Sequence, residues 1–210
     1  MNNKQALEFF KKAKNVFADN LEELSRLDSL LGDGDHGVSM LKGFTSIEQS
    51  LEGKTFASIS DLFMNAGRVL MSEIGGTCGP LFGTMFMSGA TAFRGKDDVG
   101  TPEFAAMFTN AADGVMKLGR CKAGEKTMVD ALVPAGESLK ASEAAGEELK
   151  LALTKAYEAA KAGAEATKGM LSTKGRGRYQ GEKSLGCQDP GATSVSLILY
   201  ALVSCNGKNI

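Results

Sequence analysis

The sequence lacks several features by which common protein classes are recognised. Lys and Arg number 24 against 25 Asp and Glu, so the chain has no basic excess of the kind that nucleic acids or anionic membranes attract. Its longest apolar stretch, near residues 195–203, is too short to cross a bilayer. The N-terminal segment has no apolar core like that of a secretory signal. We therefore expect a cytoplasmic protein that has neither nucleic acid nor a membrane as a partner.

Cysteine and histidine are also scarce. The four cysteines include no CxxC pair, and we expect free thiols at Cys78, Cys121, Cys187 and Cys205. His36 is the sole histidine, and no Ser/His/Asp set or Cys/His dyad is evident along the chain. The sequence therefore offers no side-chain nucleophile for covalent catalysis.

What the sequence does contain indicates a helical domain. Ala and Leu far outnumber Val and Ile, which favours helix over strand. The length of 210 residues suits one domain, over 1–210. We expect an all-α fold, an antiparallel bundle or barrel of about eight helices joined by short loops. Apolar residues recur every three or four positions near 6–27, 37–51, 58–73, 80–93, 102–118, 127–141, 147–168 and 191–204. The alanine-rich run 141–166 is interpreted as one close-packed helix.

An acidic, glycine-rich segment follows the first predicted helix. Asp28, Asp33 and Asp35 place three carboxylates within eight residues, and three glycines between and beside them allow the backbone to fold tightly. Carboxylates this close repel one another unless a cation joins them, and an all-oxygen set suits Mg²⁺ or Ca²⁺. The alternative is an Asx-rich turn that caps the following helix.

Three further loops carry residues suited to anions. The first, 75–80, has consecutive glycines before a helix, where free N–H groups can bind an anion. The second, 119–127, nearly spells a P-loop, but Glu125 interrupts the motif and no strand precedes it, so we reject that interpretation. The third, from 174 to 191, has arginines among glycines, which can hold phosphate. Each loop has a plain alternative as a flexible or solvated turn.

Taken together, the four loops offer acids for a divalent cation, free N–H groups and arginines. A nucleotide diphosphate with Mg²⁺ needs this set of groups. Phosphoryl transfer depends mainly on positioning and charge neutralisation, so the missing nucleophile is no obstacle.

These motifs, in this order, resemble the nucleotide-binding L subunit of dihydroxyacetone kinase. The resemblance covers nearly the whole chain. It rests on LD at 27–28, GDGDHG at 32–37, GGTCGPLFG at 75–83, GEKTMVD at 124–130, KGR at 174–176 and DPGATS at 189–194.

The resemblance implies a barrel of eight antiparallel helices with the nucleotide under the loops at one end. It implies two Mg²⁺ ions held by Asp28, Asp33 and Asp35, with no catalytic side chain beyond the metal and phosphate ligands. The implied residues for ADP or ATP are His36, Gly37, Val38, Ser39, Thr77, Cys78, Gly119, Thr127, Met128, Arg176, Asp189, Pro190 and Gly191. Cys78, Ser39 and Cys187 depart from the residues common in the family.

The resemblance also implies partners. A K subunit would hold dihydroxyacetone covalently, and a phosphotransferase-system M subunit would rephosphorylate ADP from phosphoenolpyruvate. The alternative enzyme is an ATP-dependent kinase subunit for another small ketose, such as a tetrulose. A non-catalytic module that holds an apolar ligand inside the barrel is a third hypothesis, and a homo-oligomer is left open.

Overall fold

The structure is a computed structural model that describes residues 1–205. Within this range the chain forms nine α-helices and three short 3₁₀ segments, and no strand longer than an isolated bridge. The α-helices are α1 (Asn3–Asp19), α2 (Leu21–Leu31), α3 (His36–Leu51), α4 (Ile59–Glu73), α5 (Cys78–Ala90), α6 (Thr101–Gly119), α7 (Val129–Ala144), α8 (Leu149–Ala166) and α9 (Pro190–Cys205). The 3₁₀ segments are η1 (Thr91–Phe93), η2 (Thr167–Gly169) and η3 (Arg176–Ser184). No helix in this range is both long and apolar enough to cross a membrane.

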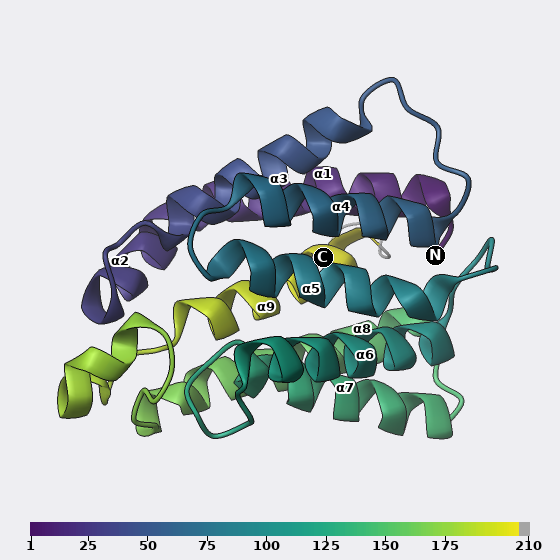
Figure 1. Cartoon of the computed structure of the whole chain (residues 1–210). Helices are drawn as coiled ribbons and strands as arrows, with labels where there is room; N and C mark the ends of the chain where they lie inside the picture. The colour runs from purple at the N-terminus through teal and green to yellow at the C-terminus, as the bar shows by residue number, and fades with distance from the viewer. Residues whose placement is uncertain (206–210) are drawn as a thin grey trace.

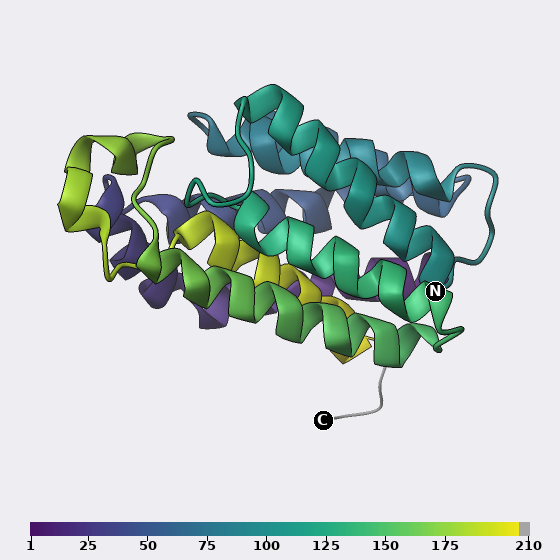
Figure 2. The same ribbon diagram turned by 90° about the horizontal axis from the view of Figure 1, so that it is seen from below.

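Eight of the helices form a closed antiparallel ring. Each helix from α3 to α9 packs against the next one along the chain, α9 packs against α1, and α1 packs against α3. Most connections between successive helices are short, apart from the 167–189 segment before α9 that contains η2 and η3. They produce the up-and-down order that Figures 1 and 2 show from two sides. The all-α barrel expected from the sequence is confirmed. Residues 206–210 of the predicted domain lie outside the described range, and all four cysteines are free.

The predicted helix over 6–27 is wrong as a single element, because it is divided into α1 and α2. Asn20 leaves helical geometry with φ −110° and ψ 12°, and its side-chain Nδ2 donates to the Val16 carbonyl at 2.8 Å. The apolar period continues across this break because Leu24 and Leu27 of α2 are buried as well. Periodicity alone therefore conceals the break, and α2 becomes a ninth helix that packs on α3 and α9.

The alanine-rich run 141–166 is not one helix either. α7 ends at Ala144 and α8 begins at Leu149. Gly146 occupies a positive φ of 66°, which a glycine adopts without steric cost, and its N–H bonds the Glu143 carbonyl at 2.9 Å. One glycine thus reverses the chain within this run and separates α7 from α8, which correspond to the separate apolar periods over 127–141 and 147–168.

Phenylalanine side chains fill one half of the barrel. The Phe63 ring, fully buried on α4, lies 5.2 Å from Phe10 and 5.1 Å from Phe93, both edge-on. Phe9 and Phe86 complete the cluster around it. These residues lie near the start of α1 and α4 and the end of α5, which place them toward the end of the barrel that holds the N-terminus (Figure 1).

The loops singled out in the sequence gather at the opposite end. Figure 1 shows the α2–α3, α4–α5 and α6–α7 connections there, together with η3, the yellow-green segment before α9. Antiparallel order explains this placement, because every second connection of an up-and-down barrel falls at the same end. We call this the loop end, and the end with the N-terminus the far end.

Candidate metal and phosphate site

Three carboxylates converge at the loop end. Asp28 lies in the last turn of α2, Asp33 in the connection and Asp35 at the start of α3, and one ligand oxygen from each lies within 4.8 Å of the others. Gly34 makes the tight reversal possible at φ 79°. Three hard oxygen donors, two of them exposed and one half-buried, fit Mg²⁺ or Ca²⁺ rather than a softer metal. The sequence prediction that these three residues lie together is confirmed.

Arg176 reaches the same cluster from η3. Its Nη1 forms an ion pair with Asp33 Oδ1. Because 143 residues separate the two in sequence, only the barrel brings them together. A guanidinium beside the carboxylates can also meet the phosphate of a nucleotide, to which it binds in a bidentate manner.

His36 holds the acidic loop against α9. Its Nε2 lies 2.8 Å from Ser194 Oγ, and its backbone N–H donates to Asp28 Oδ2 at 3.3 Å. Burial lowers the pKa of His36 to about 4, although the charge of Asp28 and the backbone at Pro190 act in the opposite direction. The imidazole is therefore neutral at pH 7 and serves as a hydrogen-bonding group. Ser194 was not among the predicted residues, although it ends the DPGATS motif.

Cys78 lies beside the histidine at the start of α5. Its Sγ is 3.8 Å from His36 Nδ1 and 3.9 Å from Met40 Sδ. Burial raises the pKa of Cys78 to about 12, and the charges of Asp35 and Asp28 add to the effect. The thiol therefore stays protonated at neutral pH.

Three helices, α3, α5 and α7, begin at this end without a side-chain cap, and the first two follow residues of a capping type. Asp35 precedes α3 and Thr77 precedes α5, and both are residue types that commonly cap, yet neither side chain bonds its own helix. The His36 N–H bonds Asp28, and no side chain caps the other first N–H groups of α3 and α5, where the helix dipole favours an anion. This arrangement supports the predicted anion role of the 75–80 loop.

The 120–128 loop is organised by Asp130, which the sequence analysis did not single out. Its carboxylate accepts from the backbone N–H of Gly124 at 2.5 Å and of Thr127 at 2.8 Å. Met128 ends this loop and lies close to Gly191 at the start of α9. A methyl group added at Gly191 would be 3.5 Å from the Met128 Cβ. The loop before α7 and the start of α9 therefore meet, as the prediction for Met128 and Gly191 requires.

Asp189 immediately precedes α9, and the pKa of its carboxyl group is shifted. Its Oδ2 accepts from the Ala192 backbone N–H at 2.7 Å, an N-cap interaction. Burial raises the pKa of Asp189 to about 7, and Asp130 contributes in the same direction. Pro190 lies next to it and is buried against His36, so this turn contacts the acidic loop.

The remaining predicted residues differ in what they contact. Gly37 is buried, and a methyl group there would lie 2.3 Å from the Leu21 carbonyl oxygen. The missing side chain therefore allows α3 to pack closely on α2. Ser39 is half-buried one turn into α3, whereas Val38 is exposed. Gly119 ends α6 beside Leu81 of α5, at the same end of the barrel.

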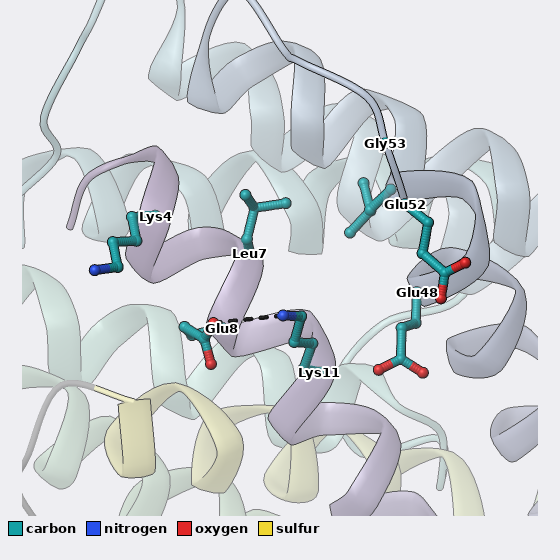
Figure 3. A pocket seen from close by; sticks show the side chains of 8 residues that line it. Lys4, Leu7, Glu8, Lys11, Glu48, Glu52 and Gly53 are labelled. Carbon is teal, nitrogen blue, oxygen red and sulfur yellow. Dashed lines mark ion pairs between the residues drawn. The ribbon is translucent and has the colours of Figure 1, made fainter.

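A surface groove lies away from this site. It measures about 480 Å³ and runs between the first turns of α1 and the end of α3, at the far end (Figure 3). Glu8 and Lys11 form a 3.6 Å ion pair within it. Its lining mixes both signs of charge and includes none of the residues predicted to bind metal or nucleotide: Lys4, Leu7, Glu8, Lys11, Glu48, Leu51, Glu52 and Gly53.

The fold and the site together define a class: closed helical barrels with a candidate cation and phosphate site at one end. Comparison with known proteins gives the family. Residues 30–204 match the DAK2 domain, and the chain belongs to the DAK2 domain family.

Two curated relatives and one solved structure illustrate the similarity. The chain is 37% identical to the ADP-binding subunit DhaL of the PEP-dependent dihydroxyacetone kinase of Escherichia coli, over 94% of both chains. It is also 37% identical to the L-erythrulose 1-kinase of Mycolicibacterium smegmatis, over 89% of this chain but 33% of that protein. The crystal structure of the dihydroxyacetone kinase from C. freundii in complex with AMP-PNP and Mg²⁺ has a TM-score of 0.72 and 26% identity. That match covers 97% of this chain and 34% of the other.

Proposed function

We propose that this chain is the ADP-binding subunit of a phosphoenolpyruvate-dependent dihydroxyacetone kinase. The reaction transfers a phosphoryl group from the nucleotide to dihydroxyacetone held on a separate subunit. The observation that carries the proposal is the convergence of three carboxylates at one end of the barrel, within a chain that matches a DhaL subunit over 94% of both lengths. The chain acts as one domain over 1–210.

In this proposal Asp28, Asp33 and Asp35 hold two Mg²⁺ ions. Bound there, the ions would neutralise the charge of the phosphates and of the transferred phosphoryl group. The chain's own contribution is positioning: α3 and α5 begin without a side-chain cap, and Arg176 adds a positive charge beside Asp33. Neutral His36 keeps the acidic loop against α9.

The nucleotide would contact residues from all four loops. The proposed set is the one predicted from the sequence: His36, Gly37, Val38, Ser39, Thr77, Cys78, Gly119, Thr127, Met128, Arg176, Asp189, Pro190 and Gly191. Its support is that the approach of Gly191 to Met128 and the contact of Pro190 with His36 bring separate motifs to one end of the barrel.

The proposed partners are a dihydroxyacetone-binding K subunit and a phosphotransferase-system M subunit, with a cytoplasmic location. The loop end supports docking because it exposes large apolar side chains around the site. Val38 is 57% exposed and Tyr179 is 75% exposed, and Leu30 and Leu185 add to the same rim. A partner that covers this rim would also exclude water from the transferred phosphoryl group.

The nucleotide content of the purified protein tests the proposal. The chain is purified in Mg²⁺ buffer without added nucleotide and then denatured, and the released nucleotide is quantified by ion exchange. We expect about one ADP per chain, because a cofactor that is rephosphorylated in place must not dissociate. A chain that retains no ADP and binds neither ADP nor ATP on titration would contradict the proposal.

A second candidate, supported by the match to the L-erythrulose 1-kinase, is an ATP-dependent kinase subunit for a tetrulose. The two candidates differ in the phosphoryl donor. An empty chain that binds ATP and works with a K-type subunit without the M subunit would favour the second candidate. Activity that requires phosphoenolpyruvate and the M subunit would favour the first.

A further inference from the structure

Lys126, in the loop before α7, directs its ammonium into the protein. Only 2% of the residue is exposed, and Nζ donates to the Thr167 carbonyl at 2.7 Å and to the Cys187 carbonyl. Its backbone has a φ of 59°, a left-handed conformation that is uncommon for a residue with a side chain. A lysine in a glycine-containing loop normally extends into solvent, so both the burial and the backbone require an explanation.

The two carbonyl acceptors belong to different parts of the nucleotide end. Thr167 follows α8, and Cys187 lies in the segment that leads to α9. Lys126 itself lies in the loop that Asp130 organises. One ammonium therefore joins three segments of the chain. Lys126 and Thr167 are 41 residues apart in the sequence, and Thr167 and Cys187 are 20 apart.

Thr167 extends this connection to Asp189. Its Oγ1 accepts from the Asp189 backbone N–H at 2.9 Å and donates to the Ala164 carbonyl at 2.5 Å. α8 can lie this close to the loop because Gly163 has no side chain: a methyl group there would be 2.1 Å from the Asp130 carbonyl oxygen. The position of Asp189 is thus fixed through Thr167, and that of the preceding Cys187 directly by Lys126.

Burying the charged Lys126 ammonium costs free energy, as the shift of its pKa shows. Burial lowers the pKa of Lys126, while the nearby charges of Asp189, Cys187 and Asp130 raise it. A buried ammonium is stable only where hydrogen bonds and opposite charges replace its lost water. Lys126 has both hydrogen bonds and nearby acidic groups. Because its bonds go to the backbone carbonyls of Thr167 and Cys187, they fix the positions of those two segments relative to the Lys126 loop.

We propose that Lys126 is a positioning residue, whose ammonium fastens the 124–128 loop to the 187–189 segment and so sets the shape of the nucleotide pocket. The inference rests on the proposed nucleotide-binding function. It assigns no contact between Lys126 and the nucleotide or the reacting atoms. Its effect passes through Met128 on one side and Asp189 on the other.

Two substitutions and one control test this role in the full-length protein. Lys126→Met removes the ammonium and keeps most of the apolar stem, whereas Lys126→Gly removes the side chain and also relieves the left-handed backbone. Lys155→Met is the matched control, because Lys155 forms a 2.5 Å ion pair with Glu147 at the far end. The measurements are Mg²⁺·ADP affinity by calorimetry, after removal of any bound nucleotide, and amide hydrogen exchange without nucleotide.

We expect both Lys126 variants to bind Mg²⁺·ADP about tenfold more weakly or worse, because charge-assisted hydrogen bonds are lost. Amides of residues 185–189 should exchange faster, while those of Gly124 and Thr127 stay protected by Asp130. Lys155→Met should change neither quantity. If Lys126→Met unfolds, the glycine variant decides, because its backbone is less strained than that of the wild type.

Two results would overturn the proposal. The first is unchanged ADP affinity in a folded Lys126 variant, and in the glycine variant this would show that only the loop backbone matters. The second is unchanged exchange at 185–189. If the wild type itself binds no nucleotide, the proposed function fails, and the exchange data still report whether Lys126 fastens the two loops.

Discussion

The two ends of the barrel treat their helix N-termini differently. At the far end the chain satisfies them itself: Asn2 caps α1, Ser58 caps α4, and Glu103 accepts from the N–H that precedes α6. α8 is the exception there, since Glu148 makes no cap. At the loop end, Asp35 and Thr77 leave α3 and α5 uncapped, whereas Asp189 caps α9. Capping side chains thus stabilise most helix starts at the far end, whereas Asp35 and Thr77 at the loop end bond nothing in the helices that follow them.

The contrast extends to packing and charge. The aromatic cluster around Phe63 fills the far half, and the N-terminal amine is held by Asp98 at 2.8 Å and by the Val99 carbonyl. The loop end instead gathers three carboxylates of like charge, which oppose folding in the absence of a cation. Stabilising contacts are therefore concentrated at the far end, and groups able to bind a ligand are concentrated at the loop end. Substitutions at the two ends should separate these two properties.

The largest effect is expected from the acidic cluster. The double variant Asp33→Ala and Asp35→Ala should lower phosphoryl transfer by roughly 10³-fold or more, since loss of one preorganised electrostatic group already costs about 10²–10³. Its melting temperature without Mg²⁺ should not fall, because like charges are removed and the Arg176 pair is exposed. Transfer is measured with the partner subunits reconstituted.

The matched control changes two carboxylates at the far end. Asp61→Asn with Asp98→Asn removes charges that interact with Ser58 and the N-terminus. This variant should keep full transfer activity. Equal loss of activity in both double variants would remove the distinction between the two ends.

The core cluster should show the reverse pattern. Phe63→Ala leaves a cavity among buried rings and should lower the free energy of unfolding by about 3–5 kcal/mol, as measured by urea denaturation. The affinity of the remaining folded protein for Mg²⁺·ADP should be unchanged. Tyr179→Ala, at the exposed rim, is the control and should change stability by less than about 0.5 kcal/mol. A large stability loss at Tyr179 would contradict the separation.

The pH dependence of stability should carry a signature of the loop end. The pKa of Asp189 is raised to about 7 in the folded state from 3.8, so the folded chain binds a proton more readily than the unfolded chain. Asp189 should therefore add roughly 2.5 kcal/mol of stability in Mg²⁺-free buffer as the pH falls from 8 to 5. His36, whose folded pKa is lowered to about 4, loses a comparable amount over the same range, so the Asp189 contribution is read as the difference between the wild type and an Asp189 variant. Asp189→Asn can still cap α9 and should lack this increment.

At the far end, the pKa of Asp98 is shifted downward, so its contribution to stability changes with pH in the opposite direction. The N-terminal amine lowers the pKa of the exposed Asp98, so its stabilisation is present above pH 4 and is lost as the pH falls further. Melting temperatures of wild type, Asp189→Asn and Asp98→Asn between pH 3 and 8 separate the two contributions. An Asp189→Asn variant with the wild-type slope between pH 8 and 5 would show that the carboxyl is not held neutral.

The smallest effect compares the two kinds of N-terminus directly. Ser58→Ala removes the cap at Asp61 and should cost about 1 kcal/mol of stability without changing nucleotide affinity. Thr77→Ala removes a side chain that caps nothing, so stability should stay within about 0.5 kcal/mol while Mg²⁺·ADP affinity falls. Urea melts and calorimetry on the pair measure both quantities. A stability loss at Thr77 equal to that at Ser58 would refute the contrast.

Much of the fold could be predicted from the sequence because its signals are local. The periodic apolar residues locate the ring helices, and short connections imply the antiparallel order. The break at Asn20 was missed, and the alanine-rich run 141–166 was wrongly interpreted as one helix although the apolar periods over 127–141 and 147–168 are separate. Burial of Leu24 continues the apolar period across the first break, and alanine favours helix on both sides of Gly146.

The acidic cluster was also predictable, since Asp28, Asp33 and Asp35 are close in sequence and one turn unites them. The Asp33–Arg176 ion pair, the His36–Ser194 hydrogen bond and the inward course of Lys126 were not. The Lys126 ammonium, for instance, finds its acceptors 41 and 61 residues away.

The sequence by itself determined the helical class, the acidic loop and the family resemblance, because each depends on residue types at short, fixed spacings. Only the tertiary structure decided which end receives each loop, which capping residues stay free and which lysine turns inward. Those outcomes depend on contacts between segments far apart in the chain, and closure of the ring brings these segments together.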